Sequence, residues 1–160
     1  MMKSIKTFVL ALLFTMPLCA WSQTYVFEDD RMWQPDMLLN VQNGLILPGD
    51  SRFNGDAILN IHDGKVFAGF STSPFDLLYT FIDNKLYLTD SRFSGDVLYS
   101  YEDGKIFAGD STFPLDLLYT VRNGMVYKEN SISAFDRLLV LSGNPTPEEI
   151  IGILLALQML

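Results

Sequence analysis

The segment DSRFNGDAILNIHDGKVFAG, residues 50 to 69, returns as DSRFSGDVLYSYEDGKIFAG at residues 90 to 109. Weaker copies lie between and after these two, so the sequence repeats every twenty residues. Six successive copies place an aspartate at the same position: Asp36, Asp56, Asp76, Asp96, Asp116 and Asp136. Because no twenty-residue unit can bury its apolar side alone, the sequence predicts a stacked array of small supersecondary units.

Each copy contains two strand-like segments joined by a two-residue turn. The first segment is rich in aromatic and β-branched residues, as in LLYTF at 77–81 and VLYSY at 97–101. An Asn-Gly, Asp-Gly or Asp-Asn pair follows it, and these pairs tolerate the positive φ angles of a type I′ turn. The repeating unit is therefore predicted to be a tight β-hairpin.

The two ends of the array are half-hairpins. Residues 25–28 align with the second strand of a hairpin, and residues 138–141 form a first strand with no partner after it. The sequence thus predicts an all-β array of six hairpin repeats with about twelve short antiparallel strands. The half-hairpins either pair with each other, which gives a closed barrel or propeller-like ring, or remain as the ends of an open solenoid.

A short apolar helix is predicted at the C-terminal end. Thr146 as N-cap, Pro147 at the first helical position and Glu149 three residues after the cap form a capping box. The segment IIGILLALQML that follows is apolar all round, which indicates a buried helix. At about 14 residues it spans roughly 20 Å, too short to cross a bilayer. We expect residues 146–160 to cap or plug the array.

Alternation across the turns indicates which strand residues form the core. In the repeat around residue 100, Tyr99, Tyr101, Ile106 and Ala108 share one apolar face. The other face is mixed and carries the aromatics Phe67, Tyr87, Phe107 and Tyr127, which are expected to meet the loop aromatics Trp33, Phe53, Phe93 and Phe113 in a second layer. Alternate loops differ in kind, with Arg-Phe at 52–53 and 92–93 but proline at 74 and 114. These loops are expected to emerge on opposite sides.

Residues 1–22 have the pattern of a secretory signal peptide. Two lysines precede an apolar stretch from Phe8 to Phe14, and Ala20 and Ser22 fit cleavage before Gln23. The predicted organisation is a signal peptide at 1–22, a hairpin repeat domain at 23–145 and a capping helix at 146–160. The sequence predicts an exported protein, periplasmic, secreted or at the cell surface, of bacterial type. Lipidation at Cys19 is the alternative.

The net negative charge narrows the range of expected binding partners. The whole chain has a net charge of −8, and removal of the two lysines in residues 1–22 makes it about −10. Nucleic acids and anionic membranes require a basic face, so neither is expected as a partner. No membrane span is predicted in the mature chain, since outer-membrane strands need about 9–11 residues and these look shorter.

The aspartate ladder, Asp36 to Asp136 in steps of twenty, invites a catalytic or metal-binding interpretation. A residue present in every copy just before a strand is better explained by a hydrogen bond to nearby backbone amides that orders the loop. Calcium is the alternative, because Asp90, Ser91 and Asp96 are oxygen ligands, but their spacing matches neither of the known calcium-binding repeats. We therefore expect a structural ladder and no metal.

No catalytic constellation is evident. His62 is the only histidine and occupies a variable hairpin position, and there is no phosphate loop or nucleophile elbow. We expect no cofactor and no enzymatic activity, and predict an exported binding module with a protein or glycan partner. Arg52, Phe53, Arg92 and Phe93 are the predicted binding residues, since arginine and aromatic side chains dominate binding hot spots. The alternatives are an assembly subunit of a cell-surface complex and, third, an enzyme.

Overall fold

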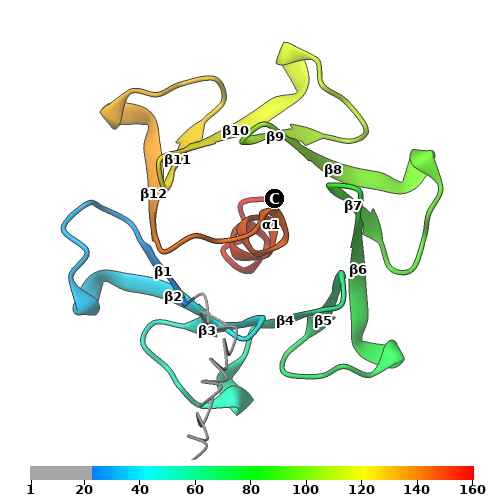
Figure 1. Cartoon of the computed structure of the whole chain (residues 1–160), viewed down its shortest axis with the longest axis horizontal. Coiled ribbons are helices and arrows are strands. Elements are labelled where there is room, and N and C mark those ends of the chain that lie inside the picture. Colours follow the sequence, from blue (N-terminus) through cyan, green and yellow to red (C-terminus); the bar gives the residue numbers. More distant parts are fainter. Residues whose placement is uncertain (1–22) are drawn as a thin grey trace, which may run out of the picture.

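The computed structural model describes residues 23–160, and the predicted signal peptide with Cys19 lies outside these residues. Twelve antiparallel strands form a closed barrel around one α-helix (Figure 1). The strands are β1 (Thr24–Phe27), β2 (Met37–Gln42), β3 (Leu45–Pro48), β4 (Leu59–His62), β5 (Lys65–Ala68), β6 (Leu77–Ile82), β7 (Lys85–Leu88), β8 (Val97–Glu102), β9 (Lys105–Ala108), β10 (Leu117–Arg122), β11 (Met125–Lys128) and β12 (Arg137–Ser142). The helix is α1 (Pro147–Ala156).

The two half-hairpins pair with each other and close the ring. Tyr25 of β1 lies opposite Ser142 of β12, and Phe27 lies opposite Val140, while the other edge of β1 pairs with β2. The predicted all-β array of six hairpin repeats is confirmed. The array is a closed ring and not an open solenoid. Because every strand has two neighbours, no sheet edge is left to pair with another chain.

The tight turns have the predicted type I′ geometry. At the first of them Asn43 has a φ of 53° and Gly44 a φ of 80°, and the other four turns repeat this pair of positive angles. A side chain at position 44 would also collide with the carbonyl oxygen of Ile61 on the next hairpin. Glycine is therefore required there both by the turn and by the neighbouring strand.

The lumen of the barrel is filled by α1, which Figure 1 shows at the centre of the ring. Ile151, Ile153 and Leu154 are at most 1% exposed and pack among the inward-facing strand residues. At Gly152 an added Cβ would lie 2.8 Å from Ile46 Cδ1 and 2.7 Å from Ile61 Cδ1, so the helix lies directly against the wall. The helix predicted to cap or plug the array is thus an internal plug.

Both ends of α1 are fixed. The Thr146 hydroxyl accepts a hydrogen bond from the Glu149 amide at 3.2 Å, and the Glu149 carboxylate accepts one from the Thr146 amide at 2.9 Å, as the predicted capping box requires. Beyond the helix, the Tyr119 hydroxyl donates to the carbonyl of Met159 at 2.6 Å. No helix within residues 23–160 is long and apolar enough to span a membrane.

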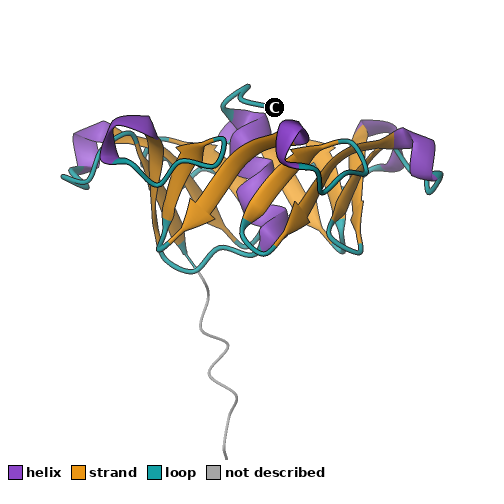
Figure 2. Ribbon diagram, turned by 90° about the horizontal axis from the view of Figure 1, so that it is seen from above, coloured by secondary structure: helices purple, strands orange, loops and turns teal. Residues whose placement is uncertain are grey.

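Six long loops extend from one rim of the barrel, each carrying a short 3₁₀ turn (Figure 2). We number them long loop 1 (28–36), 2 (49–58), 3 (69–76), 4 (89–96), 5 (109–116) and 6 (129–136). The expectation that alternate loops emerge on opposite sides is wrong. Each twenty-residue repeat contains two antiparallel strands, so the chain returns to the same rim in every copy.

The predicted core face is confirmed for Tyr99, Tyr101 and Ile106 but not for Ala108, which is exposed, and the predicted second layer does not form. Tyr99, Tyr101 and Ile106 pack in the lumen with α1. The loop aromatics expected to cover the outer face are instead exposed, by 69% to 79% of their surface: Trp33, Phe53, Phe93 and Phe113. The outer face is covered by loop backbone, which is held by one polar strand residue in five of the six repeats, whereas the sixth has Val140 there. Asn60 shows the pattern, because its amide donates to the carbonyl of Ser71 at 3.0 Å.

Candidate functional site

The aspartates of the ladder order the long loops, but their hydrogen-bond partners are serine hydroxyls and not the backbone amides that were expected. In long loops 2 to 6 the aspartate accepts a hydrogen bond from a serine hydroxyl five residues earlier, as Asp56 does from Ser51 at 2.6 Å. The same serine oxygen accepts the amide of Phe53 at 3.3 Å. The other pairs are Ser71–Asp76, Ser91–Asp96, Ser111–Asp116 and Ser131–Asp136. Asp36 has no such serine, because Arg31 occupies that position.

Acids considered as calcium ligands have cationic partners. Asp90 lies 3.6 Å from Lys65 Nζ, and Asp110 lies 2.7 Å from Lys85 Nζ. The hydrogen bond that Lys85 donates to Asp110 raises the pKa of Lys85. Within residues 23–160 no three histidine, cysteine or acidic side chains gather as metal ligands.

The predicted binding residues share a rim but not a site. Arg52 and Phe53 belong to long loop 2, and Arg92 and Phe93 belong to long loop 4, with long loop 3 between them. Neither arginine makes a hydrogen bond or ion pair within the described part of the chain. Of the four residues, only Arg52 lines the cavity described below.

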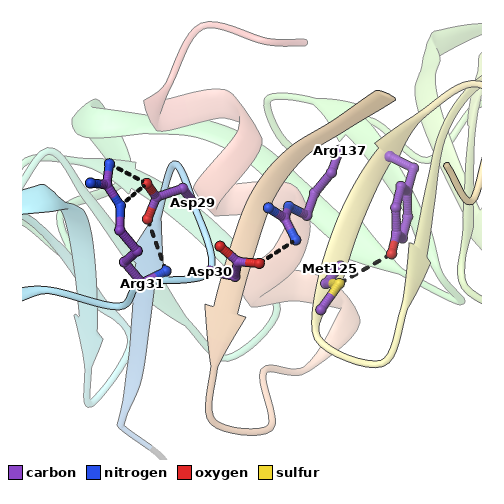
Figure 3. A network of polar contacts seen from close by, with 6 residues as sticks. Asp29, Asp30, Arg31, Met125 and Arg137 are labelled. Carbon is purple, nitrogen blue, oxygen red and sulfur yellow. Dashed lines mark hydrogen bonds and ion pairs between the residues drawn. The ribbon is translucent and has the colours of Figure 1, made fainter. Parts of the chain in front are cut away.

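The ring closes at a seam between long loop 6 and long loop 1. Arg137 at the start of β12 forms an ion pair with Asp30 at 3.3 Å (Figure 3). Beside it, the Arg31 guanidinium lies 2.6 Å from Asp29 and holds the pKa of that carboxyl below its usual value. Long loop 1 therefore has its own arrangement of charges in place of the serine clamp.

A cavity of about 330 Å³ opens on the outer wall beside this seam. Its lining comes from β12, β1 and β2 and from long loops 1 and 2. Its lining includes the side chains of Tyr25, Met32, Gln34, Gln42, Asp50 and Arg52. Met32 has a φ of 48°, unusual for a residue other than glycine, at a place where the other loops have no left-handed residue. The repeat is thus locally broken where the cavity lies.

In two other sectors of the ring a lysine spans the groove that is open here. Tyr25 and Asp50 occupy the repeat positions that Lys65 and Asp90 occupy forty residues later, and Lys85 and Asp110 sixty residues later. In those two sectors the lysine crosses the groove to the aspartate. At the seam a tyrosine replaces the lysine, and Asp50 instead accepts a hydrogen bond from Gln34 Nε2 at 3.2 Å. The groove between the loops stays open.

Several hydrogen-bonding groups of the cavity remain available. Gln42 uses its amide nitrogen to reach Asn40 Oδ1 at 2.6 Å, which leaves its carbonyl oxygen to accept. Arg52 is exposed, and its five N–H donors have no partner within residues 23–160. Tyr25 adds a half-buried aromatic ring. The site combines one aromatic surface with amide, carboxylate and guanidinium groups.

The sequence contained a signal for this site that the repeat pattern hid. Tyr25 belongs to the N-terminal half-hairpin, which aligns with the second strand of the other hairpins. The equivalent positions carry Leu45, Lys65, Lys85, Lys105 and Met125, so Tyr25 is the one aromatic residue of this series.

Comparisons with known proteins give one match. No curated protein and no solved structure is significantly similar to the chain. The sequence profile of the family described as 6-fold beta flower protein matches residues 26–154. This range covers the second half of β1, all of β2 to β12 and most of α1. With six hairpin repeats closed into a ring, the chain belongs to the 6-fold beta flower family.

Proposed function

We propose that this protein is an exported, non-enzymatic binding module that takes the end of a glycan into the cavity beside the seam. The observation that carries the proposal is the groove between long loops 1 and 2, where Tyr25 stands at the position from which Lys65 and Lys85 each reach an aspartate in two other sectors. This groove holds the cavity of about 330 Å³. Its lining residues Tyr25, Met32 and Gln34 do not recur at the equivalent positions of the other repeats, so they serve no need that each copy shares.

The chemistry of the lining favours a sugar. A sugar ring presents apolar C–H groups on its faces, which pack on an aromatic ring, and hydroxyls at its edge, which both donate and accept. Tyr25 supplies the ring, Arg52 supplies donors, and Gln42 and Asp50 supply acceptors. Cavities for small ligands usually measure about 300–1,000 Å³, so this one suits a terminal sugar better than a long chain.

The same lining supports binding without turnover. Glycoside hydrolysis generally uses two carboxyl groups on opposite sides of the scissile bond. Among the residues that line this cavity, Asp50 is the one carboxylate, and neither histidine nor cysteine is present. The second candidate function is that of an assembly subunit of a cell-surface complex. The exposed apolar side chains of the long loops favour it.

Calorimetric titration of the exported protein with a panel of neutral and acidic mono- and disaccharides tests the proposal. Arg52→Ser should weaken binding by about tenfold or more, because arginine side chains are frequent binding hot spots. Arg92→Ser is the matched control, since Arg92 has the same repeat position two repeats later and lies outside the cavity. It should leave the affinity unchanged.

A second variant closes the cavity without removing a polar group. Tyr25→Lys restores the residue found at positions 65 and 85, and the new ammonium group should reach Asp50 as Lys85 reaches Asp110. We expect a folded protein that no longer binds the sugar. If no saccharide of the panel binds, or if Arg92→Ser weakens binding as much as Arg52→Ser, the cavity is not a glycan site.

A further inference from the structure

The large apolar side chains that the protein exposes gather at one rim. Within residues 23–160 they are Met32, Trp33, Phe53, Ile58, Phe70, Phe75, Leu88, Phe93, Phe113, Leu115, Ile132 and Phe135. All but Leu88 belong to the long loops, and Leu88 ends β7 directly before long loop 4. The rim of the tight turns contributes none of them. Single exposed apolar residues are ordinary, but such segregation marks a contact surface.

Every long loop presents one of these side chains at or beside its 3₁₀ turn, along the rim that Figure 2 shows from the side. In long loops 3, 5 and 6 the middle residue of the turn is apolar, and Phe75, Leu115 and Phe135 are 98–99% exposed. In long loops 1, 2 and 4 the aromatic precedes the turn. We call these six residues the tip set: Trp33, Phe53, Phe75, Phe93, Leu115 and Phe135.

The same rim is strongly acidic. Each turn ends in an aspartate of the ladder, and long loops 1, 2, 4, 5 and 6 carry further acids, of which Asp90 and Asp110 are paired with Lys65 and Lys85. Lysines at positions 65, 85 and 105 start their strands at the opposite, tight-turn rim. Most of the net negative charge therefore surrounds the tip set. A second copy of this face or an anionic lipid surface would be repelled, whereas a cationic surface would be attracted.

We propose that the long-loop rim docks a basic protein surface, whose apolar pockets receive the tip set while its cationic side chains face the loop acids. Aromatic side chains surrounded by complementary charge are frequent hot spots of such interfaces. Six similar contacts around one ring also add their binding energies. Their combined affinity can therefore be high even though each contact alone is weak. None of the tip set lines the cavity beside the seam, and the docking of a basic surface does not depend on a glycan ligand.

The probe is an immobilised amphipathic helical peptide of leucine and lysine, with the same peptide carrying glutamate in place of lysine as its charge control. The whole exported protein should bind the lysine peptide and not the glutamate peptide. Binding should weaken as NaCl rises from about 0.05 to about 0.5 M, because exposed charges are screened over this range. The triple variant Phe75→Ser/Leu115→Ser/Phe135→Ser should bind at least about tenfold more weakly.

The tip residues are almost fully exposed, so the triple variant should keep its far-UV circular dichroism and urea midpoint. The double variant Asn54→Ser/Ser94→Ala changes exposed polar residues of two other 3₁₀ turns and should bind like the wild type. Equal peptide affinity of the wild type and the triple variant would overturn the proposal, as would no binding of the lysine peptide. Preferential binding to phosphatidylcholine vesicles would indicate a membrane surface instead. Sedimentation showing a wild-type dimer that the triple variant loses would indicate a second copy.

Discussion

Replacing Ile151 with alanine removes a side chain from the middle of the plug. Ile151 is fully buried in α1, and its neighbour Gly152 lies against Ile46 and Ile61 without space for even a Cβ. The ring of strands encloses α1, so moving the helix to fill the space that Ile151→Ala leaves would open a space on its opposite side. The lost side chain therefore becomes a cavity rather than a small rearrangement.

Substitutions of buried isoleucine by alanine cost about 2–5 kcal/mol, and the cost rises with the volume of the remaining cavity. Because collapse is blocked here, we expect the upper part of that range, about 3–5 kcal/mol in the free energy of unfolding. With a urea dependence of about 2 kcal/mol per molar, the unfolding midpoint should fall by about 2 M. Leu155→Ala is the control in the same helix. Its side chain is only partly buried, so it should cost about 1 kcal/mol.

Urea unfolding is best followed by far-UV circular dichroism. The single tryptophan of residues 23–160, Trp33, is 69% exposed in long loop 1, so its fluorescence is insensitive to the state of the lumen. An Ile151→Ala cost no larger than that of Leu155→Ala would show that α1 does not fill the barrel. The helix would then be an external cap, and the core would consist of strand residues alone.

The loop clamp and export give the remaining predictions. Asp96→Ala should lower the free energy of unfolding by about 1 kcal/mol through loss of the Ser91 hydrogen bond, and addition or chelation of calcium should not change this cost. Asp36→Ala, which removes a ladder residue without a serine partner, should cost less, and a calcium-dependent midpoint that Asp96→Ala abolishes would contradict the clamp. For export, intact-mass measurement should find the protein beginning at Gln23, whereas acyl chains on Cys19 would establish a lipoprotein.

The local fold was predictable from the sequence because its determinants are local. Asn-Gly and Asp-Gly pairs set the turn type, strand alternation identified the lumen face, and the Thr146 capping box marked the start of α1. Ring closure was left open, because it depends on β1 pairing with β12 across more than a hundred residues of chain. No short-range pattern encodes whether the accumulated twist and tilt of six hairpins bring the two ends together.

The outer surface was predicted less well, for a different physical reason. The loop aromatics were expected to be buried because burial of such side chains is usually favourable. The outer face instead satisfies loop carbonyls with Asn40, Asn60, Thr80, Ser100 and Thr120, so the loop backbone takes the place that Phe53 and Phe93 were expected to fill. The polar residue that recurs every twenty positions from 40 to 120 was visible in the sequence. Its hydrogen-bond partner was not.

The number of repeats and the character of α1 are physically coupled. A barrel of about eight strands is just filled by its own side chains, and the interior widens as strands are added. A ring of twelve strands therefore leaves a lumen that strand residues alone do not fill. An amphipathic helix would place its polar side against an apolar wall, whereas α1 lies inside the ring and has only apolar residues and glycine from Ile150 to Ala156. The lumen is thus filled by the core. The long loops and the cavity beside the seam are the surfaces on which the repeats differ, and we assign binding to them.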